Sequence, residues 1–423
     1  MPEFDPHAAP AAPFRETKRR LAEAVQANRA EILDLSHRIH ATPEPAYEER
    51  QAAAWVAQSL RDHGFDVEAP VGTLETAIRG RLRGGAGAGP RIGVLAEYDA
   101  LPGLGHGCGH NTMAASGVGA AIALASMAGE LGGEIVFLGC PAEERGSGKA
   151  QMIADGLFDG LDAALLYHPC DRSHVHCEAL ASEDIEVVFT GRQAHAASDP
   201  WKGLNALDAL ILLFNGVALW RQQLRPSSRV HGIVQEGGTA ANIIPDRARA
   251  WFMIRSDDRA YYETMRARFR EIAEGAALQA GVAVEIGFFG GATTMNSNRA
   301  LAERWVANAL AYGVVDQGPD PFIGSTDMGN VSWVVPTIHP DLSIVDRPTP
   351  GHSIDFRDAA ARPLADATTL LAATLVAQTA YELFADPALV EAAWAEFRAT
   401  AGSPSGSAGP AATADAASGA GPG

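Results

Sequence analysis

The chain has 423 residues, of which 47% are hydrophobic and 20% are charged, and this length predicts about two or three domains. Its 51 acidic residues outnumber its 33 lysines and arginines, so the formal net charge is −18 at pH 7. This balance argues against nucleic acid or an anionic membrane as a partner, and an anionic substrate would need specific local cations.

The two ends of the chain are predicted to be disordered. Residues 1–13 are rich in Pro and Ala, and residues 399–423 consist almost wholly of Ala, Gly, Ser, Pro and Thr. Neither segment has enough apolar surface to offset the entropy of ordering it. We therefore expect the chemistry to lie between these tails.

The first half of the remaining chain alternates helix and strand. Residues 14–40 have helical periodicity, and a second helix over 47–63 is closed by Gly64. Short, continuous apolar runs follow, as expected for strands of a sheet that is covered on both faces. These predicted strands are 77–83, 91–96, 134–140 and 163–168.

From residue 184 the order of the elements changes. The pattern predicts strand, helix, strand, strand, helix and strand, which is the order of a ferredoxin-like module. These elements are 184–190, 204–222, 229–235, 247–255, 258–280 and 282–289. The earlier alternation then resumes, with a helix at 299–312, a strand near Thr337 and a last helix at 363–384.

The predicted fold class is therefore α/β. We expect a mixed sheet with helices on both faces, formed by residues 14–183 and 292–398. Residues 184–291 form an inserted α+β domain of the ferredoxin-like type.

Three features favour a cytoplasmic protein. Met1-Pro-Glu-Phe-Asp-Pro carries acidic residues and prolines where a secretory signal needs a basic and an apolar stretch. Residues 114–129, the longest weakly polar run, are too few for the ~20 residues of a membrane span and predict a buried helix. Four cysteines are too few for a disulfide scaffold in a chain of this length.

Side chains of metal-ligating types gather after the predicted strands. They are Cys108, His110, Glu143, Glu144, His168 and His352. All but His352 follow a predicted parallel strand, and the carboxyl ends of such strands meet in one crevice. The sequence therefore predicts a joint metal site.

The donor set indicates which metal and how many ions. Thiolate, imidazole and carboxylate together suit Zn²⁺, and Mn²⁺, Co²⁺ or Ni²⁺ fit the same set. The number of candidate ligands exceeds the number that one catalytic ion with an open coordination position needs, so we predict two divalent ions. Of the neighbours Glu143 and Glu144, one can bind metal while the other moves a proton from the attacking water to the leaving nitrogen.

Each residue also has an ordinary structural interpretation. Cys108 alone could be a buried apolar side chain, a pair such as Glu143 and Glu144 is usually solvated, and His168 could be a core histidine. Together these interpretations require several independent coincidences at successive strand ends, so the joint metal site is favoured.

Several motifs occur together in this chain. They are Leu95-Ala-Glu-Tyr-Asp-Ala-Leu-Pro, Gly107-Cys-Gly-His, Pro141-Ala-Glu-Glu, Tyr167-His-Pro, Gly191-Arg-Gln-Ala-His and Gly351-His-Ser. In combination they resemble the metallopeptidase family of aminoacylase and carboxypeptidase G. The Cys-Gly-His form is similar to its amidohydrolase branch, which includes hippurate hydrolase, p-aminobenzoyl-glutamate hydrolase and a β-alanyl-lysine dipeptidase. The resemblance runs from Arg19 to Asp386.

This resemblance implies a role for each candidate. The implied metal ligands are Cys108, His110, Glu144, His168 and His352. Glu143 is then the general base. The resemblance also implies an α/β catalytic domain whose ferredoxin-like lid often forms the dimer contact.

Three residues of the insertion match lid positions of that family. His195 matches a histidine that reaches an active site, commonly that of the partner subunit, and polarises the scissile carbonyl. Asn242 and Arg255 match positions that hold a substrate carboxylate. Alternatively, His195 caps the helix near Leu204, and the other two are a loop amide and a strand-end cation.

One motif departs from the family pattern. Other members carry His-x-Asp where this chain has Glu97-Tyr98-Asp99, and they use a bridging Asp where this chain has Cys108. Asp99 is expected to orient a ligand histidine. Asp327 either orients the crevice or caps a helix.

We therefore predict a metal-dependent amidohydrolase or dipeptidase that acts on an N-acyl amino acid or a dipeptide-like amide, of the p-aminobenzoyl-glutamate or β-alanyl dipeptide type. It is expected to form a homodimer through the insertion, with no nucleic-acid or membrane partner. Two alternatives use the same residues. One is a non-catalytic, metal-binding regulatory protein with a redox-labile Cys108, and the other is a deiminase or ureido-hydrolase.

Overall fold

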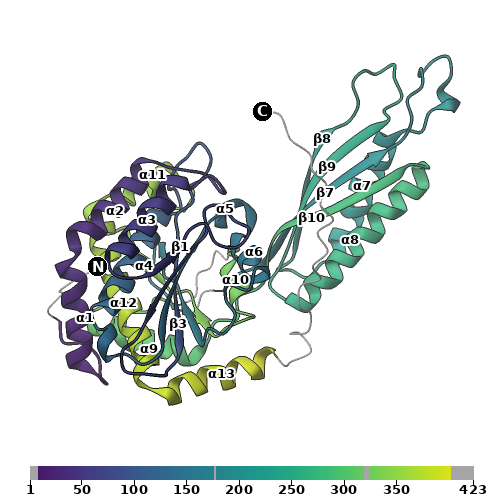
Figure 1. Cartoon of the computed structure of the whole chain (residues 1–423). Helices are drawn as coiled ribbons and strands as arrows, with labels where there is room; N and C mark the ends of the chain where they lie inside the picture. The colour runs from purple at the N-terminus through teal and green to yellow at the C-terminus, as the bar shows by residue number, and fades with distance from the viewer. Residues whose placement is uncertain (1–7, 176–177, 319–323, 402–423) are drawn as a thin grey trace.

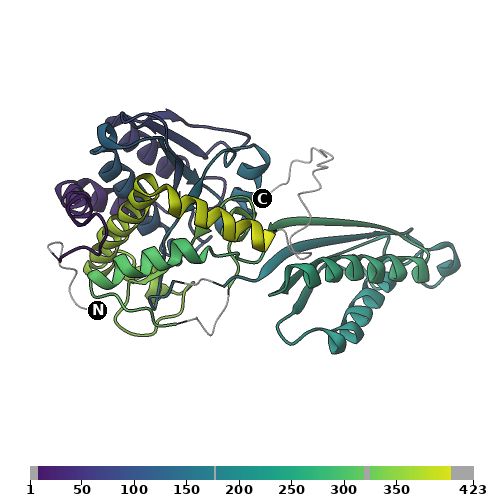
Figure 2. The same ribbon diagram turned by 90° about the horizontal axis from the view of Figure 1, so that it is seen from below.

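The computed structural model describes residues 8–175, 178–318 and 324–401. Within these ranges the chain is organised around a six-stranded main sheet and a four-stranded second sheet, each with its own hydrophobic cluster (Figure 1). We call residues 181–292 the second unit and the remaining described residues the main unit. Figure 2 shows the second unit extending away from the main unit.

The main sheet is mixed, as predicted. Its strand order is β1-β2-β4-β3-β5-β11. The second strand, β2, runs antiparallel to both neighbours, whereas all the other pairs after it are parallel. The strands are β1 (Asp66–Glu68), β2 (Ile78–Arg83), β3 (Arg91–Glu97), β4 (Glu134–Cys140), β5 (Ala163–Leu165) and β11 (Thr337–Ile338).

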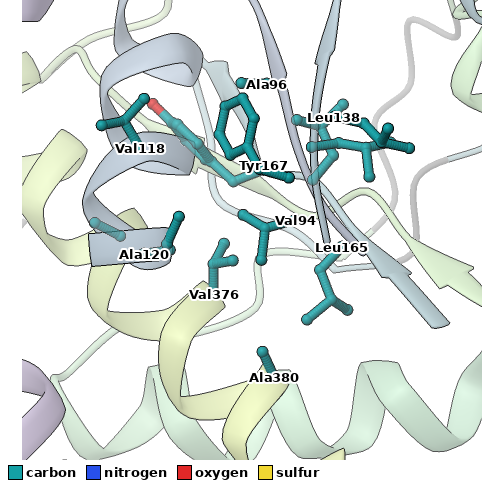
Figure 3. Packing of buried hydrophobic residues seen from close by; sticks show 14 of the residues in the cluster. Val94, Ala96, Val118, Ala120, Leu138, Leu165, Tyr167, Val376 and Ala380 are labelled. Atoms are coloured by element: carbon teal, nitrogen blue, oxygen red, sulfur yellow. The ribbon is translucent and has the colours of Figure 1, made fainter. Parts of the chain in front are cut away.

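Two long apolar helices, α4 (His110–Ala125) and α12 (Pro363–Ala385), form the centre of the main core. Almost every residue of α4 is buried, because small and apolar side chains surround the whole helix. Figure 3 shows Ala120 of α4 and Val376 of α12 beside Val94 of β3. This packing holds the loop that joins β3 to α4 against the end of the sheet.

The main unit contains further helices. They are α1 (Arg15–Ala27), α2 (Arg29–Ala41), α3 (Arg50–Asp62), α5 (Glu143–Gly146), α6 (Gly148–Ala154), α9 (Arg299–Ala311), α10 (Met328–Val331), α11 (Ile354–Ala359) and α13 (Pro387–Ala401). In Figure 1, α1 to α4 and α12 lie on one side of the sheet, and α5, α6 and α10 lie on the side toward the second unit. Among the described helices, none combines the length and apolar character that a membrane crossing requires.

The second unit has its elements in the predicted order. Its antiparallel strands lie in the order β10-β7-β9-β8, and two helices pack together on the sheet (Figure 1). The elements are β7 (Ala181–Thr190), α7 (Ala206–Trp220), β8 (Arg229–Glu236), β9 (Arg247–Ser256), α8 (Arg259–Ala280) and β10 (Ala283–Ala292). The Phe252 and Phe269 rings, 5.1 Å apart, lie in its core.

One predicted helix and one predicted strand differ from the structure. The helix expected over 14–40 is two helices that meet at Asn28, whose side-chain amide donates to the Ala24 carbonyl 2.8 Å away. The strand expected over 163–168 ends at Leu165. Residues 168–170 instead form β6 (His168–Cys170), which pairs with β12 (Asp341–Ser343) in a small separate sheet.

Parts of both segments that were predicted to be disordered are ordered in the structure. Ala8 packs against the main core, and the Ala11 carbonyl accepts a hydrogen bond from Lys18 Nζ. At the other end, α13 continues to Ala401 because Leu389 and Phe397 of this helix are buried. The other residues of the two predicted tails, 1–7 and 402–423, lie outside the described residues.

Candidate active site

The five predicted metal ligands come together at the carboxyl ends of the main strands. The ligand atoms of Cys108, His110 and His168 all lie within 4.8 Å of one another. The same is true of Cys108, Glu144 and His352. The Cys108 sulfur belongs to both groups, so it lies where it could be shared by two ions.

Glycine gives the loop after β3 its shape. Gly109, the residue before α4, has a φ of 77°, a left-handed conformation that side-chain-bearing residues rarely adopt. A Cβ atom there would lie 2.8 Å from Pro169 Cγ. The glycine therefore lets Cys108 and His110 approach the strand that carries His168.

Asp99, which is expected to orient a ligand histidine, lies against His110. Its Oδ1 atom lies 2.9 Å from His110 Nδ1, which leaves His110 Nε2 directed toward the other ligands. The other carboxylate oxygen accepts a hydrogen bond from the Glu144 amide at 2.9 Å. One buried carboxylate therefore aligns two parts of the ligand cluster.

The environment of Cys108 favours its thiolate. The sulfur lies 3.5 Å from His168 Nε2. Burial opposes ionisation, but the neighbouring His168 and His110 outweigh burial and hold the pKa of Cys108 well below its usual range. The thiolate is the form of cysteine that binds metal.

The turn after β4 separates the two adjacent glutamates. Glu144 Oε2 lies 3.5 Å from His352 Nε2, and Glu144 Oε1 lies 3.9 Å from His110 Nε2. Glu143 lies with Glu97 and His110 in a third group of close ligand-type atoms. Burial raises the pKa of Glu143 well above its usual range, and the Glu97 charge adds to this rise.

His352 reaches the cluster from a strained position. Its φ of 56° is left-handed, and its amide donates to the Gly107 carbonyl at 2.9 Å. Its side chain is 58% exposed, so it closes the outer side of the group formed with Cys108 and Glu144. Strained backbone of this kind gathers at functional sites.

The cluster has the properties of a site for divalent ions. His110 Nε2 and Glu144 Oε1 are buried and have no hydrogen-bond partner among the described residues. An unpaired buried polar atom costs about 1–3 kcal/mol, and a cation between these atoms would satisfy both. Sulfur, nitrogen and oxygen donors together suit the ions that the sequence predicted.

Next to the candidate ligands lies a buried charged cluster, formed by Lys149, Glu97 and Asp327, that the sequence did not predict. Lys149 Nζ lies 2.5 Å from both Glu97 Oε1 and Asp327 Oδ1, and all three side chains are almost completely buried. Asp327 Oδ2 also accepts from the Lys149 amide at 2.9 Å, which lies in the first turn of α6, so Asp327 both pairs with Lys149 and caps this helix. Burial alone would lower the pKa of Lys149, but the two carboxylates hold it well above its usual value.

A cleft of about 980 Å³ lies over the candidate ligands and extends to the second unit. Asp184 of β7 and Arg255 of β9 line it, opposite Glu143 and His352 of the main unit. Arg255 Nη1 lies 3.5 Å from Ser325 Oγ, and its Nε lies 3.2 Å from Met253 Sδ. Of the three predicted lid residues, Arg255 is the one that the structure brings to the cleft.

The other two lid residues lie side by side outside this cleft. His195 and Asn242 are both exposed, and the Asn242 carbonyl accepts from the Ala196 amide at 3.0 Å. His195 Nδ1 accepts from the Ala197 and Ser198 amides, each at 3.2 Å, so it stabilises its own turn. The alternative interpretation of His195 as a helix cap is wrong, because the Asn205 side chain caps α7.

A mixed α/β unit that gathers thiolate, imidazole and carboxylate ligands beside a substrate-sized cleft defines a metal-dependent hydrolase. The chain belongs to peptidase family M20/M25/M40, whose profile matches residues 93–344. It is an enzyme that hydrolyses C–N bonds, and the family predicted from its motifs is confirmed.

Curated relatives cover nearly the whole chain. The mouse Xaa-Arg dipeptidase is 34% identical over 419 residues, which is 93% of this chain and 95% of the relative. One of the subunits of the p-aminobenzoyl-glutamate hydrolase of Escherichia coli is 29% identical over 455 residues, with 89% of this chain and 94% of the relative covered.

Solved structures share the fold. A dinuclear metal-binding peptidase of the M20 family from Bacillus subtilis superimposes with a TM-score of 0.62 at 21% identity, over 83% of this chain and 98% of its own. An aminobenzoyl-glutamate utilization protein from Klebsiella pneumoniae gives 0.66 at 21% identity, over 84% and 98%. The mixed α/β fold predicted from the sequence is thus confirmed.

Proposed function

We propose that this enzyme is a dipeptidase or amidohydrolase with a centre of two divalent ions. The proposed ligands are Cys108, His110, Glu144, His168 and His352. The observation that carries the proposal is the position of the Cys108 sulfur, which belongs to both groups of ligands. When bound, Zn²⁺ or Mn²⁺, or alternatively Co²⁺ or Ni²⁺, supplies Lewis-acid activation of the water and of the scissile carbonyl.

The residues around the centre divide the remaining work. Glu143 takes a proton from the attacking water and delivers it to the leaving nitrogen, a task that its raised pKa favours. Arg255 holds the substrate carboxylate from the second unit, because its guanidinium reaches the cleft. Asp99 keeps His110 in the orientation that binding requires.

The relatives suggest the chemical class of substrate. Two of them are named after Xaa-Arg dipeptides and p-aminobenzoyl-glutamate. Both compounds are amides that release an amino acid when the amide bond is hydrolysed. We therefore expect an N-acyl amino acid or a dipeptide to be hydrolysed at this bond.

A substrate panel tests this function. It contains Xaa-Arg dipeptides, β-alanyl dipeptides, p-aminobenzoyl-glutamate and N-acyl amino acids, each assayed with Mn²⁺, Zn²⁺ and Co²⁺. The expected result is metal-dependent release of a free amino acid, lost on chelation and restored by metal. Release of ammonia from ureido compounds alone would favour the deiminase or ureido-hydrolase, and metal binding without any turnover would favour the regulatory protein.

The thiol ligand can be tested by metal affinity. Asp99→Asn is expected to weaken metal affinity about 10- to 100-fold, because it disturbs the orientation of a ligand. Cys108→Ser is expected to weaken it more, because a neutral hydroxyl is a poor metal ligand. Chelator competition measures this affinity. Cys170→Ser is the matched control, since this half-buried thiol lines the cleft but lies outside both ligand groups. Equal affinity in the Cys108 and Cys170 variants would remove Cys108 from the centre.

We also propose that the second unit, a ferredoxin-like domain by its strand order, is a lid that forms a homodimer. The edge strand β8 exposes Ile233 and Val234, at 57% and 53%, which suits pairing with a second copy.

His195 lies exposed on this unit, outside the cleft of its own chain. Because His195 Nδ1 accepts two amide hydrogen bonds, the neutral ring carries its proton on Nε2 and can donate it to a carbonyl of the partner's substrate.

Mixing two inactive variants tests whether His195 acts in the partner's site. His195→Ala keeps its metal ligands, and His110→Ala keeps its lid histidine. A heterodimer then contains one complete site, so subunit exchange is expected to restore up to about one quarter of wild-type activity. Differently tagged chains establish that exchange occurs. With exchange established, no recovery would refute the action in the partner's site and leave His195 acting within its own subunit or only stabilising its turn.

A further inference from the structure

The turn that carries Glu143 and Glu144 has an unfavourable backbone at both ends. Ala142 and Ser147, which flank α5, have φ values of 58° and 52°. Both are left-handed although neither residue is glycine, and such a conformation persists only where the surrounding structure holds it. Contacts that hold this turn therefore control where the two carboxylates point.

Glu49 holds the first end of the turn from a distant segment of the chain. Its Oε1 atom accepts from the Ala142 amide at 2.9 Å and from the Tyr47 amide at 2.9 Å. Its Oε2 atom accepts from Thr76 Oγ1 at 2.8 Å. The side chain is completely buried, so each oxygen depends on these donors.

Tyr47 holds the other end of the same turn. Its hydroxyl donates to the Gly146 carbonyl at 2.9 Å, and Tyr47 is itself left-handed, with a φ of 69°. A Cβ atom on Gly146 would lie 2.0 Å from this hydroxyl, so the close contact requires glycine there. Glu49 and Tyr47 thus connect one short segment to both ends of the turn.

We propose that Glu49, assisted by Tyr47, is a positioning residue that directs Glu143 and Glu144 into the candidate metal centre. This inference rests on the proposed function, because it assumes that Glu143 moves the proton. Neither residue touches the cluster of ligands, so they act through the backbone of the turn. A displacement of about 1 Å at a reacting group can cost about 100-fold in rate.

The chemistry of Glu49 allows a matched pair of variants. Burial raises the pKa of Glu49 to about 7, and the Asp99 charge adds to the rise, so the neutral carboxyl form is less unfavourable here than at the surface. Glutamine can accept both amide hydrogen bonds through its oxygen and donate to Thr76 Oγ1 through its nitrogen. Alanine can do neither.

Steady-state kinetics of Glu49→Ala and Glu49→Gln are the first test. At full metal content, Glu49→Ala is expected to lower kcat about 100-fold with little change in KM, and Glu49→Gln is expected to stay within about 3-fold of wild type. Glu44→Ala is the structural control, because the Glu44 carboxylate caps α3 through the Gln51 and Ala52 amides and is not bonded to the turn. Unchanged kcat in Glu49→Ala, or equal losses in the Gln variant or in Glu44→Ala, would overturn the proposal.

Hydrogen exchange of metal-free protein is the second test, and it does not depend on activity. Amides of residues 142–146 are expected to exchange at least about 10-fold faster in Glu49→Ala than in wild type, and at the wild-type rate in Glu44→Ala. Unchanged exchange in Glu49→Ala would overturn the proposal whatever the kinetics. An inactive wild type with faster exchange in Glu49→Ala would refute the proposed function and leave the contact of Glu49 with the turn supported.

Discussion

Replacing Glu143 with glutamine is expected to lower kcat by about 10²- to 10⁴-fold while the bound metal stays at its wild-type level. Glutamine keeps the size of the side chain but cannot accept and return a proton. The proposed ligands on either side of it, among them Glu144 and His110, are unchanged. Single-turnover kinetics and elemental analysis of the same preparation measure the two effects.

The neighbouring glutamate provides the matched control. Glu144→Gln should lose metal first and activity as a consequence, because Glu144 lies between His352 and His110. Glu143 also lies within 4.8 Å of ligand-type atoms of Glu97 and His110. Metal loss in Glu143→Gln with metal retained in Glu144→Gln would therefore reverse the two assignments.

Replacing Lys149 with methionine is expected to destabilise the main unit by about 3–5 kcal/mol, because it leaves two buried carboxylates without their cation. These carboxylates belong to Glu97 and Asp327, each 2.5 Å from Lys149 Nζ. The free energy of unfolding in urea, measured on metal-free protein, reports this loss without the contribution of bound ions.

An exposed lysine is the control for this variant. Lys202→Met removes the ion pair with Asp199 on the surface of the second unit, and a change within about 1 kcal/mol is expected. Combining Lys149→Met with Asp327→Asn should recover part of the loss, since one fewer charge then stays buried. A loss below about 1 kcal/mol in Lys149→Met alone would show that the two carboxylates find other compensation.

Much of the fold could be predicted because most elements have a local pattern in the sequence. The apolar runs that form β3 and β4, and the order of elements in the second unit, are visible there. The break at Asn28 was not predicted, since helical periodicity continues through it. The strand ending at Leu165 was also missed, because His168 pairs with a segment more than a hundred residues away.

The candidate site shows the same division. The residue types predicted the five candidate ligands, all but His352 also by their places after strands, and the structure brings the five side chains together. Glu49 and Lys149 were not predicted as parts of the site, because their partners lie far away in the chain and no spacing rule connects them. Lys149 itself gave no signal, because it stands in the polar, glycine-containing segment Gly146-Ser-Gly-Lys-Ala-Gln, where a lysine is ordinarily exposed.

The strands that lead into and out of the second unit are paired with each other, Ser182 opposite Ala292. Opposed residues in an antiparallel pair have Cα atoms about 4.5–5.5 Å apart. The second unit therefore leaves and re-enters the main unit at neighbouring points, like a loop with its two ends in contact. The entropy of closing a loop grows only slowly with its length. Insertions, deletions or even exchange of the second unit should thus alter specificity and assembly while costing the main unit little of its own folding free energy.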